Sequence, residues 1–218
     1  MVVRTIDVKK YPFWPPNGDE EILGPKVPYL SSIRTLLFLG SHTRPDISFL
    51  LNLLARYNAG YMSNPHTDRS QTGYVFTSYN AAISWRSVKQ TMSATSLNHA
   101  EILAIHEASQ ECVWLRSVIH HIRESCGISS GEEAPTVVHE YNVACIAQLK
   151  DGYIKGDKTN HILPKFFFTH DLQKSGDIIV QKVRLSDNLA DLFTKALPTV
   201  TFKKLVHGIG MRRLNEIK

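Results

Sequence analysis

The chain has 218 residues, of which 43% are hydrophobic, 9% aromatic and 21% charged. This composition is typical of globular proteins and argues against a long disordered chain. The most apolar stretch, residues 47–55, is far shorter than the roughly 20 residues of a membrane-spanning helix, and the first ten residues contain no apolar leader. We therefore expect an intracellular protein with no membrane partner.

The net charge of +5 is concentrated toward the C-terminal end of the chain. After residue 200, five basic residues stand against Glu216 alone; they are Lys203, Lys204, Arg212, Arg213 and Lys218. Such a cluster suits a polyanion, because each phosphate contact adds affinity that is independent of sequence and sensitive to salt. A solvated face of a C-terminal helix explains the same charges equally well.

The first 57 residues predict an irregular arm followed by two short helices. Residues 1–28 contain five prolines, which disfavour regular secondary structure. The apolar segments 30–39 and 46–57 have helical character, and Pro45 suits the first turn of the second helix.

From residue 58 onward the pattern alternates between strands and helices. Residues 70–77 and 82–88 indicate a hairpin, and a long helix is expected from a cap at Thr95 or Ser96 to Gly127. A strand at 136–141, a helix at 143–150, a strand at 178–183 and a helix at 187–197 follow. This order predicts an α/β fold in which one mixed sheet combines an antiparallel hairpin with parallel crossovers.

The three cysteines, Cys112, Cys126 and Cys145, lie in apolar segments and show no Cys-x-x-Cys spacing. This pattern predicts small buried thiols. The histidines also lack the intervals of zinc ligands, so no zinc site is expected.

Seven short motifs are spread over nearly the whole chain. They are YLSSI at 29–33, TRPDI at 43–47, SQTGYVF at 70–76, ISWRSVKQ at 83–90, HAEI at 99–102, ECVWL at 111–115 and NLADLFTK at 188–195. Together they resemble the Pol polyprotein of Ty1/copia-type retrotransposons. The resemblance implies that residues 1–57 are a remnant of the C-terminal region of reverse transcriptase. It further implies a ribonuclease H-like domain over residues 58–198 and a basic C-terminal helix or tail over residues 199–218.

In this family the ribonuclease H domain cleaves the RNA strand of an RNA/DNA hybrid with four carboxylates that hold two Mg²⁺ ions. Two matching positions keep their carboxylates, Glu101 and Asp191, while Asn58 and Tyr141 stand at the other two. An Asn oxygen carries no charge, and a Tyr hydroxyl is a poor Mg²⁺ ligand at neutral pH. The resemblance therefore implies weak or no Mg²⁺ binding and a catalytically inactive site.

Two neighbouring carboxylates bear on this expectation. Glu140 precedes the replaced position Tyr141, and because side chains alternate along a strand, we expect Glu140 to point away from the site. Asp187 lies close to Asp191, and either of them can face the site at the head of the predicted helix.

The resemblance also implies an internal deletion or an aberrant splice. Several dozen residues that separate the TRPDI helix from the strand bearing the first carboxylate in the family are missing between residues 57 and 58. That strand is the central strand of ribonuclease H folds. A truncated first strand would leave backbone hydrogen bonds of its neighbours without partners.

The expected partner is nucleic acid, namely an RNA/DNA hybrid. Candidate contacts are Arg86, Lys89 and Gln90 beside Trp85 on the hairpin, Lys158 in a loop, and Lys203 and Lys204 in the tail. For each, an ordinary structural or solvated side chain is the alternative. Three functions remain open: an inactive relative of ribonuclease H, a non-catalytic hybrid-binding module, and a residual nuclease with one metal ion on Glu101 and Asp191.

Overall fold

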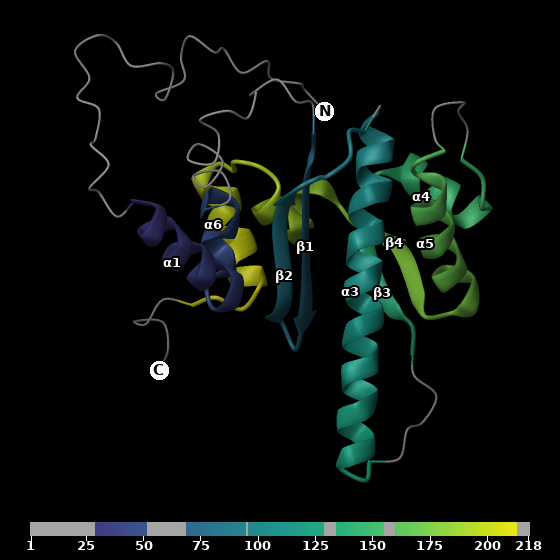
Figure 1. Ribbon diagram of the computed structural model, residues 1–218, viewed down its shortest axis with the longest axis horizontal. Coiled ribbons are helices and arrows are strands. Elements are labelled where there is room, and N and C mark those ends of the chain that lie inside the picture. The colour runs from purple at the N-terminus through teal and green to yellow at the C-terminus, as the bar shows by residue number, and fades with distance from the viewer. Residues whose placement is uncertain (1–28, 52–68, 95, 129–133, 155–159, 213–218) are drawn as a thin grey trace.

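The computed structural model describes residues 29–51, 69–94, 96–128, 134–154 and 160–212. Its elements are α1 (Tyr29–His42), η2 (Pro45–Ile47), β1 (Gln71–Ser78), β2 (Ala81–Lys89), α3 (Leu97–Ser125), β3 (Thr136–Glu140), α4 (Val143–Asp151), α5 (Leu163–Ser175), β4 (Ile178–Lys182), η3 (Leu185–Asp187), η4 (Leu189–Phe193) and α6 (Thr199–Gly208) (Figure 1). The candidate residues Asn58 and Lys158 lie outside the described residues, as does the arm 1–28.

The predicted hairpin is confirmed. Strands β1 and β2 pair antiparallel, with Thr72 opposite Val88 and Tyr74 opposite Arg86. The turn places Tyr79 and Asn80 at φ values of 50° and 61°. Two successive residues with positive φ give a turn whose twist matches that of the paired strands, and Asn tolerates this conformation well.

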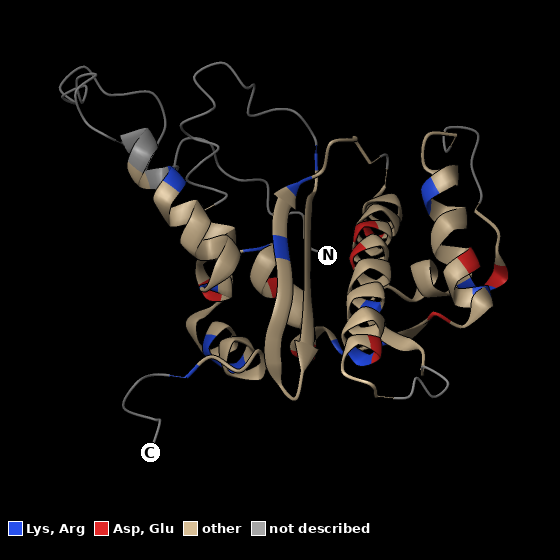
Figure 2. Ribbon diagram, turned by 60° about the horizontal axis from the view of Figure 1, so that its bottom comes forward, with Lys and Arg blue, Asp and Glu red and all other residues tan. Residues whose placement is uncertain are grey.

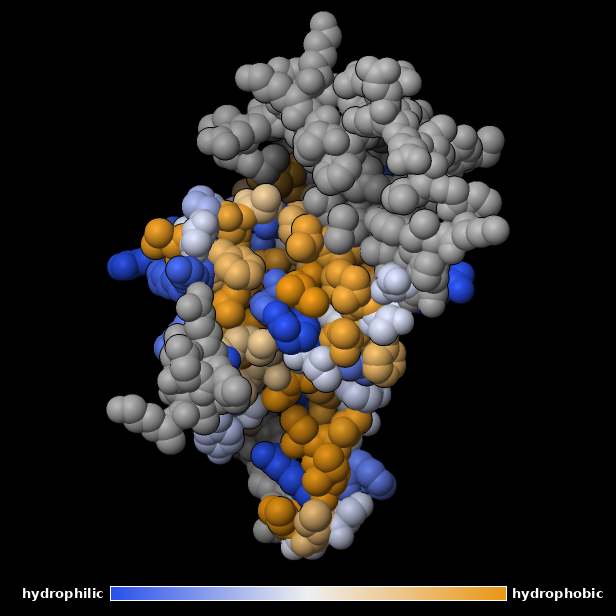
Figure 3. Space-filling view, turned by 90° about the vertical axis from the view of Figure 1, so that its left-hand side faces the viewer, coloured by the Kyte–Doolittle hydropathy of each residue, from blue (hydrophilic) through white to orange (hydrophobic). Residues whose placement is uncertain are grey.

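The long helix α3 is also confirmed, and it begins where the sequence indicates. The Ser96 side chain accepts a hydrogen bond of 3.2 Å from the backbone N–H of His99, which caps the helix. Towards its C-terminal end α3 extends past the rest of the described fold (Figure 1). The apolar side chains Val113, Trp114, Ile119 and Ile122 are exposed there, and Figure 3 shows apolar surface continuing down this end of the molecule.

Strands β3 and β4 pair in parallel, and α4 and α5 connect them. Helix α4 begins at Asn142, whose side chain accepts bonds from the backbone N–H groups of Ala144 and Cys145, and it ends at Gly152 with φ of 70°. Helix α5 was not predicted. Its three consecutive phenylalanines lie on all sides of the helix, so its sequence shows no apolar stripe of helical period.

The predicted helix at 187–197 is wrong. The structure has two short 3₁₀ turns, η3 and η4, in this region. Asn188 stands between them, and its side chain accepts a hydrogen bond of 3.2 Å from the backbone N–H of Ala190. An Asn at this position competes with the helical backbone for hydrogen bonds, and Pro198 ends the segment.

The described residues form two half-folds that share α3. The hairpin β1–β2 packs with η4 and α6 around Leu192, Phe193, Leu205 and Ile209. Strands β3 and β4 pack with α4 and α5 around a second apolar cluster that includes Ile102, Cys145, Leu149, Ile162 and Phe166. Within the described part of the chain the two sheets have two strands each and are not joined. The expected mixed sheet is therefore not continuous there, although the α/β class is confirmed.

Gly73 allows the hairpin to approach η4 closely. A Cβ atom at this position would lie 2.6 Å from Phe193 Cβ and 3.0 Å from the Phe193 backbone carbon. We expect Gly73→Ala to destabilise the fold by about 1–3 kcal/mol, because the backbone must shift to relieve these contacts. Urea unfolding measures the change. Gly40→Ala is the control, since its close neighbour is the flexible tip of Leu51, and a loss in Gly40→Ala as large as that in Gly73→Ala would contradict the prediction.

The structure also bears on membrane-spanning helices and on the burial of the cysteines. In the part of the chain that the structure covers, no helix combines the length and apolar character needed to cross a membrane. Cys112 and Cys145 are buried as expected, but Cys126 is exposed because it follows the projecting end of α3.

Candidate functional site

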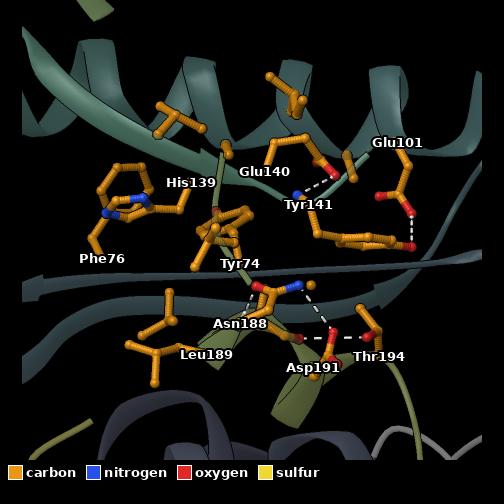
Figure 4. Close-up of a pocket in the computed structure, with 18 of the residues that line it drawn as sticks. Tyr74, Phe76, Glu101, His139, Glu140, Tyr141, Asn188, Leu189, Asp191 and Thr194 are labelled. Carbon is orange, nitrogen blue, oxygen red and sulfur yellow. Dashed lines mark hydrogen bonds between the residues drawn. The ribbon is translucent and has the colours of Figure 1, made fainter. Parts of the chain in front are cut away.

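Glu101, Tyr141 and Asp191 line one cavity of about 810 Å³. Its walls are strand β1, the N-terminal half of α3, strand β3 and the segment that contains η3 and η4. Figure 4 shows the Glu101 and Tyr141 side chains meeting on one side of the cavity, with Asp191 on the opposite side. The fold thus brings together three positions that are separated by up to 90 residues in sequence.

Tyr141 is hydrogen-bonded to Glu101. Its hydroxyl donates a bond of 2.6 Å to Glu101 Oε1. Burial raises the pKa of Glu101, while the bond from Tyr141 and the charge of Lys195 oppose this rise. Burial and the neighbouring Glu101 also raise the pKa of Tyr141, so its hydroxyl remains a proton donor at neutral pH. One carboxylate oxygen of Glu101 is therefore occupied by the Tyr141 hydroxyl.

Asp191 is held by groups of its own segment. Its Oδ2 atom lies 2.8 Å from the ammonium of Lys195, and its Oδ1 atom accepts a 3.0 Å bond from Asn188 Nδ2. Asp191 is buried, which raises its pKa, while Lys195 and Asn188 act in the opposite direction. The Lys195 ammonium also lies 5.7 Å from the centre of the Tyr141 ring. The positively charged side chain of Lys195 thus lies beside Asp191.

The sequence reasoning missed Lys195. The signal was available, because a carboxylate and a Lys four residues apart are close neighbours on one turn of a helical segment. The same reasoning left Asp187 and Asp191 as alternatives. In the structure Asp187 is exposed and pairs with Lys204 Nζ at 2.5 Å, which lowers its pKa. Asp191 is the carboxylate whose charge acts on Glu101.

Glu140 does not point away from the site, so that expectation is wrong. Its side chain is buried and curls back over the end of β3, where Oε1 accepts bonds of 2.8 Å and 2.7 Å from the backbone N–H groups of Tyr141 and Asn142. Burial raises the pKa of Glu140 to about 7, and the charge of Glu101 adds to the rise. The alternation of side chains along β3 did not predict this orientation correctly. Glu140 is the last residue of the strand, so its side chain can turn towards the backbone N–H groups that follow.

Glu140 should make stability depend on pH. Below about pH 4.5 its carboxyl is protonated in both the folded and the unfolded chain, and between pH 4.5 and 7 the unfolded chain loses the proton first. The stability that protonated Glu140 provides is therefore lost as the pH rises through 7, by up to roughly 3 kcal/mol. We expect Glu140→Gln to raise the melting temperature at pH 8 and to leave it nearly unchanged at pH 4. A Gln can still accept the two backbone bonds.

Thermal melts of the Glu140→Gln and original chains across this pH range test the expectation. The exposed Glu124→Gln is the control and should change neither melt. A Glu140→Gln chain that is less stable than the original at pH 8 would contradict the assigned protonation behaviour.

The donor set does not fit a pair of Mg²⁺ ions. Such ions need several anionic oxygens, but Glu101 accepts a hydrogen bond from the Tyr141 hydroxyl and Asp191 is paired with the Lys195 ammonium. Glu140, the third carboxyl group at the site, accepts two backbone N–H bonds. Within the described ranges, no group of three or more His, Cys, Asp or Glu side chains is arranged to hold a metal ion. No chemical step is therefore assigned to a metal at this site.

The residues proposed for nucleic-acid contact differ in their positions. Arg86 is exposed on β2, Lys89 is half-buried, and Lys203 and Lys204 are exposed on α6, where Lys204 pairs with Asp187. Figure 2 shows the basic positions of β2 and α6 on the same half of the molecule, away from α4 and α5. Arg86 and Lys203 thus keep their side chains at the surface.

Gln90 is not a surface residue, which corrects the sequence-based assignment. It is 2% exposed, and its amide nitrogen bonds to Thr72 Oγ1 and to the carbonyl of Ala100. Trp85 likewise has a structural role, since its ring nitrogen donates a 2.8 Å bond to the Gly40 carbonyl and ties the hairpin to α1. Both side chains hold the hairpin in place.

Comparison with known proteins finds relatives among plant transposons. The chain is 26% identical over 230 residues to the retrovirus-related Pol polyprotein from transposon TNT 1-94 of Nicotiana tabacum, a match covering 85% of this chain. It is 28% identical over 161 residues to the Pol polyprotein from transposon RE2 of Arabidopsis thaliana, covering 74% of this chain. It is also 26% identical over 130 residues to secreted RxLR effector protein 161 of Plasmopara viticola, a match covering 41% of this chain and 92% of that protein.

The chain spans only 16% of the tobacco polyprotein and 11% of the Arabidopsis one. No protein-family model matches the chain, and no solved structure gives a significant match. Several homologues of this chain are thus retrovirus-related Pol polyproteins of plant transposons, which supports its origin in a Pol polyprotein of the Ty1/copia type.

Proposed function

We propose that this chain is a ribonuclease H-like fragment of a retrotransposon Pol polyprotein that has lost the ability to cleave RNA in RNA/DNA hybrids. The observation that carries the proposal is the bond of 2.6 Å from the Tyr141 hydroxyl to Glu101. It places a neutral proton donor where the resemblance implies a metal-binding carboxylate. Two of the four implied carboxylates are replaced, and the remaining two are engaged by protein groups.

The charge balance at the site supports this reading. Hydrolysis of a phosphodiester in this family depends on cations that activate water and stabilise the leaving oxygen. A protein ammonium beside Asp191 reduces the negative charge that would attract such cations, and it cannot activate water as a metal does. A metal cation bound near Asp191 would also be repelled by the positive charge of Lys195.

The comparisons support the implied internal deletion. The match with the tobacco polyprotein runs over 230 residues, which exceeds the whole 218-residue chain, although only 85% of the chain is matched. The tobacco protein therefore contains, within the matched region, residues that this chain lacks. A deletion before β1 would remove part of the strand that the resemblance places between the two half-folds.

Incubation of the purified chain with a labelled RNA/DNA hybrid in Mg²⁺, and separately in Mn²⁺, tests the proposal. We expect no cleavage above that of the Glu101→Gln variant. Cleavage by the original chain that disappears in Glu101→Gln would refute the proposal and would favour a residual nuclease that uses Glu101 and Asp191.

A second candidate function is hybrid binding without cleavage. It is favoured by the exposed Arg86 and Lys203, which lie on the same half of the molecule. Binding through phosphates should weaken steeply with salt. Fluorescence anisotropy with a labelled hybrid between low and physiological salt should then show a loss of affinity, and an Arg86→Ala and Lys203→Ala double variant should bind more weakly at low salt. Identical affinity of the double variant would remove this candidate.

A further inference from the structure

The cavity that contains Glu101 also separates the two half-folds, and we infer that it binds one extended polypeptide strand supplied by another chain. We call it the strand slot: the space of about 810 Å³ between the edges of β1 and β3, with α3 on one face and the η3–η4 segment on the other. Both sheets have only two strands within the described residues, so β1 and β3 each have one edge outside the ladders. Those two edges line the same space.

The backbone of β1 directs hydrogen-bonding groups into the strand slot. The Ser70 carbonyl accepts a 2.9 Å bond from the backbone N–H of Gln90, so Ser70, Thr72 and Tyr74 are the residues that exchange bonds with β2. In an antiparallel pair the residues between them turn their N–H and C=O groups to the opposite edge. These are Gln71, Gly73 and Val75, and all three line the strand slot.

The backbone of β3 does the same from the other side. Thr136 donates to the Asp177 carbonyl and Glu140 accepts from the Val183 N–H, both at 2.9 Å, so alternate residues from Thr136 to Glu140 pair with β4. The N–H and C=O groups of Val137 and His139 then point into the strand slot. Strands β1 and β3 run in opposite directions (Figure 1), so one inserted strand would lie antiparallel to one edge and parallel to the other. Both types of ladder are stable.

The two faces of the strand slot differ in chemistry. On the α3 face, Ala100, Ala104 and Ala108 follow one another at intervals of four residues and leave room for side chains of an inserted strand. On the opposite face, polar groups of Asn188 and Asp191 stand beside the cavity (Figure 4). An occupant therefore needs alternating residues, with apolar side chains towards α3 and polar side chains towards η4.

The charged side chains that line the strand slot determine which polar residues a bound segment should carry. Four carboxyl groups, those of Glu101, Glu140, Asp187 and Asp191, line the strand slot, and Lys195 provides the single ammonium among its described lining residues. Glu140 is partly protonated at neutral pH because its pKa is raised to about 7, so the other three carboxylates supply most of the negative charge. Lys or Arg side chains on the occupant would complement this excess of negative charge. Strand β3 has five residues, and at about 3.3 Å per residue its edge accommodates a segment of roughly five to seven residues. The partner is thus a short, alternating, basic segment that adds to the sheet edges by its backbone.

Fluorescence anisotropy with the full chain and a labelled probe peptide, acetyl-Val-Lys-Val-Thr-Val-Lys-Val-amide, tests the inference. We expect saturable binding. A control peptide of the same sequence with N-methyl groups on alternate amides lacks the donors for one edge, and it should bind at least about tenfold more weakly, since each missing backbone bond leaves a buried group unpaired.

Variants of the protein locate the binding. Val137→Pro removes an N–H that lies outside the β3–β4 ladder, so the fold should persist while binding falls about tenfold; Val137→Thr is its control. Ala104→Trp fills the strand slot and should abolish binding, whereas Ser117→Trp, on an exposed part of α3, should not. A circular dichroism melt of each variant shows that it is folded.

Three results would overturn the inference. They are no saturable binding of the probe to the full chain, equal binding of the N-methylated control, and unchanged binding by the folded Val137→Pro variant. Occupation of the strand slot by the chain's own residues would give the first of these. None of them depends on hybrid cleavage, so the inference can fail while the proposed function stands.

Discussion

A chain carrying Asn58→Asp together with Tyr141→Asp is expected to cleave the RNA strand of an RNA/DNA hybrid at least roughly 100-fold faster than the original chain. Removing even one hydrogen-bond donor that stabilises a transition state typically costs a factor of about 10²–10³, and this variant restores two charged groups. The Tyr141 substitution removes the hydroxyl that donates to Glu101 and introduces a carboxylate at the end of β3. Asn58 lies outside the described residues, and its replacement restores the position that the resemblance assigns to the first carboxylate.

The single variants are the controls for this prediction. Each restores only one negative charge, so each should cleave far more slowly than the double variant. Cleavage is measured in Mg²⁺ with a labelled hybrid, and circular dichroism confirms that each variant is folded. A folded double variant without cleavage would contradict the view that the missing ligands cause the inactivity, and it would assign the defect to the residues missing before β1.

Phe166→Ala is expected to destabilise the fold by about 3–5 kcal/mol, which is a large part of the 5–15 kcal/mol that stabilises a typical domain. Phe166 is fully buried, and it packs in the apolar cluster formed by α3, α4 and α5. Its removal leaves a cavity among Ile102, Leu149 and Ile162, and the fixed helices can close it only partly.

The next residue provides a matched control. Phe167 is 44% exposed, and its ring contacts Phe166 edge-on at 5.4 Å between centroids. Phe167→Ala should therefore cost much less than Phe166→Ala in urea unfolding. Equal losses from both substitutions would contradict the placement of α5 in the structure.

The sequence predicts local structure well where one residue carries the signal. Ser96, one of the two caps expected from the sequence, accepts the bond that starts α3. Helix α5 escaped detection because three adjacent phenylalanines produce no helical periodicity. The 3₁₀ turns around Asn188 were not predicted, because the hydrogen bond that this side chain accepts from Ala190 N–H competes with a continuous helix.

The resemblance grouped Glu101, Tyr141 and Asp191, and the structure places these three residues around one cavity, but the sequence did not predict their interactions. The bond between Tyr141 and Glu101 joins residues 40 apart in sequence and depends on how β3 meets α3. Burial of Gln90 and the return of the Glu140 side chain onto its own backbone also depend on packing that a one-dimensional pattern does not contain.

Calorimetric titration of Mg²⁺ into the purified chain, beside its Glu101→Gln variant, tests most directly whether the Glu101 and Asp191 carboxylates are engaged by Tyr141 and Lys195. The structure predicts the same weak, non-saturating heats for both proteins up to millimolar Mg²⁺. Saturable binding by the original chain that is lost in Glu101→Gln would contradict this arrangement and would restore a metal-dependent site.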